Sequence, residues 1–96
     1  MDDLSTLPRL WLEPLDDRVV VEPGEEEAET KTGLIIPAST DAGARSGIVT
    51  GVGPDVHGVE PGDKILFPAT AGFEVRLTGT AVRILRRGEI IARVHD

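Results

Sequence analysis

The chain has no cysteine, no tyrosine and only three aromatic residues, which are Trp11, Phe67 and Phe73. The absence of cysteine excludes disulfides, cysteine-based metal sites and thiolate catalysis, and it fits an intracellular location. Because aromatic side chains are so few, the core must be built from valine, isoleucine and leucine.

Long apolar runs and an excess of basic residues are also missing. No apolar run is long enough to span a bilayer, and the opening MDDLSTLPRLWLEP has neither the basic start nor the apolar stretch of a secretory signal. The 10 Lys and Arg residues are outnumbered by 17 Asp and Glu residues, which gives a net charge of −7 at pH 7. Polyanions repel such a chain, so we expect no nucleic-acid partner and no membrane partner. The absence of cysteine and of a secretory signal leads us to expect a cytoplasmic location.

At 96 residues the chain is long enough for one small domain. A domain of this size buries only about 60–65% of its unfolded surface, so assembly would help to stabilise it. β-Branched runs alternate with Gly- and Pro-rich turns, and no window of a dozen residues has a sustained helical period. The pattern predicts an all-β fold, a small barrel or a sandwich, with strands at residues 17–23, 46–56, 64–67, 73–77, 80–85 and 88–94.

The residues between these strands predict two particular turns. Residues 60–63, Glu-Pro-Gly-Asp, predict a turn before the third expected strand. Thr78-Gly79 separates two short alternating runs and predicts a tight hairpin. Gly51 and Gly53 lie within the second expected strand, where glycine indicates a β-bulge or a close approach of the backbone.

No combination of residues points to catalysis, a cofactor or a metal. Asp55 and His57 are close in sequence, but a metal site needs three or four ligands, so we interpret them as exposed turn residues. The glycines of GVGPDVHG (51–58) do not have the spacing of a dinucleotide-binding loop. The acidic runs 16–17 and 25–27 are typical of a solvated charge run. We therefore expect no catalytic residue, no cofactor and no metal, and a protein that is not an enzyme.

The segment 25–47 is polar except for an aliphatic triplet, Leu34-Ile35-Ile36. One interpretation is a core strand, but the long polar flanks and Pro37 directly after the triplet argue against it. An exposed aliphatic triplet on a long loop is typical of a segment that docks in an apolar groove or on a sheet edge of a partner. Ordering the loop weakens a single docking event, so this mechanism predicts an oligomer whose copies bind together.

Several motifs, in order along the chain, resemble the chaperonin-10 family, the GroES-type co-chaperonins. PLDDRVVVEPGEEEAETKTGLIIPAS (14–39) resembles the first strand of that family followed by its mobile loop. GIVTGVGP (47–54), VEPGDKILF (59–67) and EIIARV (89–94) are similar to its later strands and turn. The resemblance covers roughly residues 13–95.

The resemblance implies a GroES-like domain over residues 13–96, an irregular β-barrel with a mobile loop at about 24–46, and residues 1–12 as an N-terminal extension. It implies a heptameric ring that caps an ATP-driven, GroEL-type chaperonin double ring and assists protein folding. It also implies that strands around Arg18–Val21 and Ile90–Val94 pair between neighbouring subunits. The chaperonin-docking residues carried over by position are Gly33, Leu34, Ile35 and Ile36.

The chain departs from the family pattern at several positions. Thr32 stands where the first of two glycines is usual, and residues 54–60 leave no room for the hairpin that forms a roof in many members. Phe73 takes the place of a nearby tyrosine, and residues 1–12 precede the usual start. These departures predict a divergent or accessory member.

Two other functions are compatible with the same residues. Residues 47–66 are also similar to the barrel of zinc-dependent medium-chain dehydrogenases, but those domains bind zinc through cysteine and need an attached nucleotide-binding domain. An adaptor could instead use the same loop on another partner without ATP. The ATP dependence of partner binding distinguishes that adaptor from a co-chaperonin.

Overall fold

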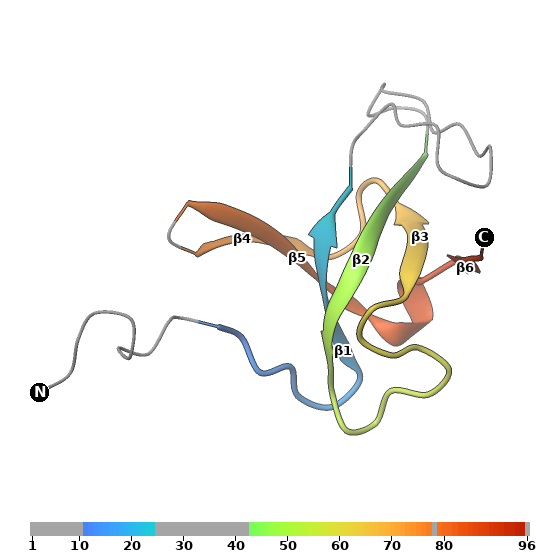
Figure 1. Cartoon of the computed structure of the whole chain (residues 1–96), viewed down its shortest axis with the longest axis horizontal. Coiled ribbons are helices and arrows are strands. Elements are labelled where there is room, and N and C mark those ends of the chain that lie inside the picture. Colours follow the sequence, from blue (N-terminus) through green and yellow to red (C-terminus); the bar gives the residue numbers. More distant parts are fainter. Residues whose placement is uncertain (1–10, 25–42, 78, 96) are drawn as a thin grey trace, which may run out of the picture.

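The computed structural model describes residues 11–24, 43–77 and 79–95. They form one six-stranded antiparallel sheet with the strand order β4-β5-β1-β2-β3-β6 (Figure 1). The elements are β1 (Arg18–Pro23), β2 (Ala44–Val52), β3 (Lys64–Pro68), β4 (Phe73–Leu77), β5 (Thr80–Arg86), the 3-10 helix η3 (Arg87–Glu89) and β6 (Ala92–Val94). The all-β prediction is confirmed. In these ranges no helix is long and apolar enough to cross a membrane.

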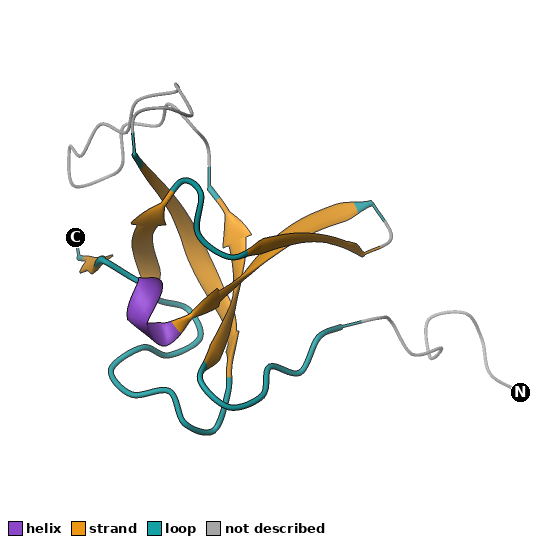
Figure 2. Ribbon diagram, turned by 180° about the vertical axis from the view of Figure 1, so that it is seen from behind, coloured by secondary structure: helices purple, strands orange, loops and turns teal. Residues whose placement is uncertain are grey.

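The core is aliphatic, as the composition predicts. Side chains from β1, β2, β3 and β5 meet in one cluster. The sheet that carries them is strongly twisted (Figure 2). Phe67 is the one aromatic side chain in this cluster, whereas Trp11 and Phe73 are 73% and 71% exposed. The fully buried side chains are Val19, Val21, Val49, Ile65, Phe67 and Leu85.

Both glycine predictions for the second strand are confirmed. Between Val20 and Val21 the β1–β2 pairing shifts by one residue, so β2 carries an extra residue, Thr50, next to Gly51. A Cβ on Gly53 would lie 2.2 Å from the carbonyl oxygen of Asp16, so the two backbone segments approach closely there. Gly53 directly follows Val52, the last residue of β2, so the strand expected over residues 46–56 ends at residue 52.

The prediction of a strand over residues 88–94 is wrong in its first half. Residues 87–89 form η3, and strand pairing is limited to Ala92–Val94. The turn is closed by Glu89, whose Oε1 accepts a hydrogen bond of 2.8 Å from the backbone N–H of Arg86. It directs Ile90 into the core, and the N–H of Ile91 then donates to the carbonyl of Leu66 on β3.

The expected pairing of Arg18–Val21 with a neighbouring subunit is also wrong, because β1 lies inside the sheet. It pairs with β2 on one side and with β5 on the other. Both rows of its backbone hydrogen-bonding groups are therefore used within the chain. Of the two strands named for that contact, β6 alone is at a sheet edge, where it pairs only with β3 in the described residues.

Candidate docking site

The four residues predicted to dock, Gly33, Leu34, Ile35 and Ile36, lie outside the described residues. The structure does describe where their segment leaves and rejoins the sheet. Gly24 follows β1 and Gly43 precedes β2, so residues 25–42 connect two neighbouring antiparallel strands at one end of the sheet (Figure 1). We use the name loop root for the residues that hold these two connections, which are Gly24, Gly43, Ser46, Gly47 and Ala69.

Backbone hydrogen bonds tie both connections of the loop root to neighbouring strands. The N–H of Gly24 donates to the carbonyl of Ser46 at 2.8 Å, one step beyond the pairing of Pro23 with Gly47. The N–H of Ala69 donates to the carbonyl of Gly43 at 2.6 Å, one step beyond the pairing of Ala44 with Pro68. The ends of β1, β2 and β3 are therefore held together where the 25–42 segment begins and ends.

Close packing at Gly47 and Gly24 and the backbone conformation at Gly43 favour glycine at three positions of the loop root. A Cβ on Gly47 would lie 2.4 Å from Cγ1 of Val21 and 2.7 Å from the carbonyl oxygen of Glu22. A Cβ on Gly24 would lie 3.0 Å from Oγ of Ser46, the one buried polar residue in the described ranges. Gly43 has a φ of 100°, which also favours glycine.

A cation from β5 supports the β3 side of the loop root. Nη1 of Arg83 donates to the carbonyl of Ala69 at 3.2 Å and to that of Ala71 at 2.7 Å. The guanidinium carbon of Arg83 lies 5.5 Å from the centroid of the Phe67 ring, in cation–π geometry. This contact could not be predicted from the sequence, because no local pattern relates Arg83 to carbonyl groups 14 and 12 residues earlier in the chain.

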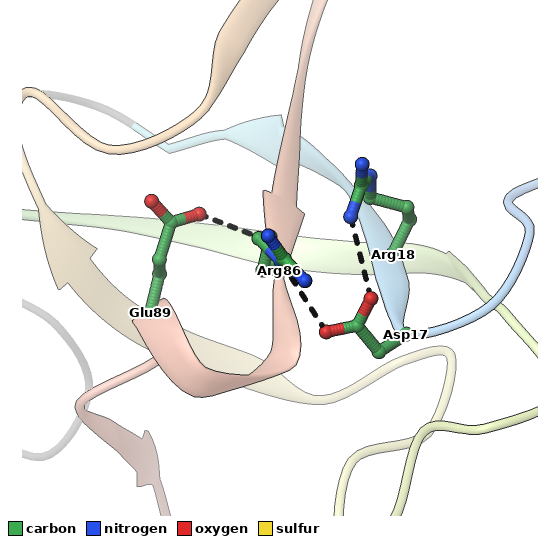
Figure 3. Close-up of polar contacts among 4 residues, drawn as sticks. All are labelled: Asp17, Arg18, Arg86 and Glu89. Carbon is green, nitrogen blue, oxygen red and sulfur yellow. Dashed lines mark hydrogen bonds and ion pairs between the residues drawn. The ribbon is translucent and has the colours of Figure 1, made fainter.

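A charged cluster lies at the opposite end of β1. Oδ1 and Oδ2 of Asp17 lie 3.3 Å from Nη1 of Arg18 and 3.5 Å from Nε of Arg86, so the carboxylate sits between two arginines (Figure 3). The backbone N–H of Arg87 also donates to the Asp17 carbonyl. The three ion-paired side chains are 33–64% exposed, and exposed pairs of this kind contribute about 1 kcal/mol or less. The cluster therefore fastens the start of β1 to the end of β5.

The residues considered for a metal site lie at this same end. Asp55 and His57 are exposed, and each forms a backbone hydrogen bond: the N–H of Asp55 donates to the Asp16 carbonyl, and Nε of Arg87 donates to the His57 carbonyl at 2.6 Å. In the described ranges no group of three or more His, Cys, Asp or Glu side chains could hold a metal ion. Val59, two residues after His57, is 4% exposed and belongs to the core. The connection between β2 and β3 therefore packs against the sheet.

The chain also exposes apolar surface beside the sheet. Residues 11–15 precede β1 without joining the sheet, and residues 12–15 line an open groove of about 320 Å³. Leu12 is half-buried there, although it belongs to the predicted extension over residues 1–12. Trp11, Leu15 and Ile91 are each at least 60% exposed. The groove is lined by Leu12, Glu13, Pro14, Leu15, Asp16, Arg18, Val20 and Ile84.

Comparisons with known proteins agree with this geometry. The model of the chaperonin 10 kDa subunit family matches residues 11–94. Co-chaperonin GroES 1 of Rhodopirellula baltica is 33% identical over 100 residues, which cover 95% of this chain and 99% of that protein. Co-chaperonin GroES of Clostridium novyi is 38% identical over 92 residues, covering 88% of this chain and 98% of the relative. Co-chaperonin GroES of Campylobacter curvus is 38% identical over 79 residues, which cover 82% of this chain and 92% of that protein.

Proposed function

Because this chain belongs to the chaperonin 10 family and is a GroES-type co-chaperonin, we propose that it caps a GroEL-type, ATP-driven chaperonin ring and assists protein folding there. A GroES co-chaperonin is a non-enzymatic cofactor of the chaperonin, so the chain is not an enzyme. In the proposal Leu34, Ile35 and Ile36 dock on the chaperonin, and Gly33 permits the turn that presents them.

The loop root is the observation that carries the docking proposal. The segment with the aliphatic triplet begins after β1 and ends before β2, two neighbouring strands, and a backbone hydrogen bond holds each of its ends to the sheet. Several copies arranged with this end on the same side would present several triplets to one partner ring. Docking of one triplet then makes docking of the next intramolecular, so weak contacts add up to a useful affinity.

Co-elution with a purified chaperonin double ring, with and without ATP, tests this function. We expect the wild-type protein to co-elute only with nucleotide. The Ile35→Glu variant should assemble normally but fail to co-elute, because an apolar groove does not readily desolvate a carboxylate. Co-elution without nucleotide would favour the adaptor function instead. If Ile35→Glu unfolds the protein, the triplet belongs to the core and the docking mechanism is wrong.

We further propose that the chain forms a homo-oligomeric ring, a heptamer by resemblance to its family. Support comes from the edge strand β6 and from the exposed apolar side chains Trp11, Leu15 and Ile91, which assembly would cover. Native mass spectrometry should give a single closed oligomer, and Ile91→Asp should shift it to smaller species. A wild-type protein that stays monomeric at micromolar concentration would contradict the ring.

The proposal includes a cytoplasmic location and no contact with nucleic acid or membrane. The net charge of −7 supports it, since DNA and anionic lipid carry the same sign of charge. Gel-shift assays with DNA and sedimentation with anionic vesicles should both show no binding at 150 mM salt, about the physiological value. Binding in either assay would count against this part of the proposal.

A further inference from the structure

We propose that Gly47 and Arg83 are positioning residues for chaperonin docking, which hold the two ends of the 25–42 segment in fixed places without contacting the partner. This inference rests on the proposed function, because that segment carries the docking triplet. Gly47 acts on the side where β1 ends. Arg83 acts on the side where β2 begins, through the end of β3.

Gly47 sets how closely the ends of β1 and β2 approach. It pairs with Pro23, the last residue of β1, and its missing side chain leaves the space that Val21 Cγ1 and the Glu22 carbonyl occupy. An alanine here would have to displace the backbone of Glu22, since a contact of 2.7 Å with a carbonyl oxygen cannot be relieved by a side-chain rotation. The movement would separate Gly24 from Ser46, whose hydrogen bond is the last one between the β1 and β2 sides within the described residues.

Arg83 fixes Gly43, where the segment rejoins the sheet, through two contacts in series. Its guanidinium holds the carbonyls of Ala69 and Ala71, and the N–H of Ala69 in turn donates to Gly43. Gly72 lies next to this turn and is itself packed against β5, where a Cβ would lie 2.2 Å from the carbonyl of Ile84. The position of Gly43 therefore depends on a side chain 40 residues later in the chain, carried by a strand in the body of the sheet.

Fixed ends matter because docking orders the segment at the expense of its conformational entropy. A segment whose ends are held close together and aimed in one direction samples fewer conformations before it binds than one with separated ends. In a ring, every copy must reach its site on the partner at the same time, so a small loss per copy is multiplied across the copies. A modest disturbance of the loop root should therefore strongly weaken the binding of the ring to the chaperonin.

The experiment compares four full-length variants, each as an assembled ring, in competition with fluorescently labelled wild-type ring for a chaperonin double ring in ATP. Gly47→Ala disturbs one side of the loop root, and Arg83→Leu removes both hydrogen bonds on the other while keeping apolar contact with Phe67. Arg83→Lys keeps a cationic donor. Gly88→Ala is the matched control, because a Cβ on Gly88 would meet nothing within 4 Å and η3 is remote from the loop root in sequence.

We expect Gly47→Ala and Arg83→Leu to weaken competition on the order of ten-fold, since the loss per copy is multiplied across the ring. Arg83→Lys should give an intermediate loss, and Gly88→Ala should compete like the wild type. Circular dichroism and native mass spectrometry establish that each variant is folded and assembled, so lost stability alone cannot produce the difference. If Gly47→Ala does not fold, the two Arg83 variants decide.

Two outcomes separate the failure of this inference from the failure of the proposed function. If wild-type ring binds with ATP and the folded Arg83→Leu ring competes equally well, Arg83 is structural only and the positioning role is wrong. If labelled wild-type ring does not bind the chaperonin at all, the proposed docking function itself fails. A Gly88→Ala ring as weak as Arg83→Leu would also overturn the inference, because the loss would then have no connection with the loop root.

Discussion

Replacing Gly72 with alanine should destabilise the fold through two separable effects. Gly72 has a φ of 74°, in the left-handed region, where a residue with a Cβ is disfavoured by about 1–2 kcal/mol. Its Cβ would also lie 2.2 Å from the carbonyl oxygen of Ile84 and 2.7 Å from Cδ2 of Leu85. Ile84 pairs with Phe73, so its carbonyl cannot retreat without disturbing the β4–β5 pairing.

The second effect is an overpacking term, for which about 1–3 kcal/mol is typical. The two terms together predict a loss of about 2–5 kcal/mol in the free energy of unfolding for Gly72→Ala. Gly62→Ala is the matched control. Gly62 has a φ of 97° in the turn over residues 60–63, but a Cβ there would meet nothing within 4 Å. Its loss should therefore be limited to about 1–2 kcal/mol.

Urea unfolding followed by far-ultraviolet circular dichroism measures both variants against the wild type. Protein concentration must be the same in all three, because the stability of an oligomer depends on it. In thermal unfolding each 1 kcal/mol should lower the Tm by roughly 4–8 °C for a chain of this size. Equal losses for Gly72→Ala and Gly62→Ala would contradict this prediction, since they would mean that the contact with Ile84 has no energetic consequence.

Two further predictions concern the core and the charged cluster at the far end of β1. Val59→Ala should lower the free energy of unfolding by about 2 kcal/mol, because it opens a cavity under the connection between β2 and β3, and urea unfolding measures the loss. No loss would mean that Val59 is not a core residue in solution. Asp17→Asn should lower stability by about 1 kcal/mol or less, since both of its ion pairs are partly exposed. That difference should shrink when unfolding is repeated at about 1 M salt, and a larger or salt-independent loss would contradict the ion-pair account.

Much of the fold could be predicted because its signals are local. The turn over residues 60–63 follows from a proline and a glycine in sequence, and the structure has the expected hydrogen bond from Asp63 N–H to the Glu60 carbonyl and a positive φ at Gly62. The β-branched run before Pro23 predicts β1, and the alternation on either side of Thr78-Gly79 predicts β4 and β5. The docking residues Gly33, Leu34, Ile35 and Ile36 were also identified from one contiguous motif, and their role stays a prediction.

Most of the strands could be predicted from the sequence, because the alternation and the turn residues that specify them are local. The aliphatic character of the core follows from composition, and the family from motifs that lie in order along the chain. The tertiary structure alone decided that β1 is an interior strand, since that depends on pairing with residues 80–86 as well as 44–52. It alone showed η3, whose closing carboxylate interrupts an otherwise strand-like run, and the support of Ala69 and Ala71 by Arg83. The strand pairings of β1 and the contacts of Arg83 join residues that are distant in sequence, so no local pattern of residues could have specified them. The bond that closes η3 is local, since Glu89 accepts from Arg86 three residues earlier, but the strand-like run around it concealed the turn.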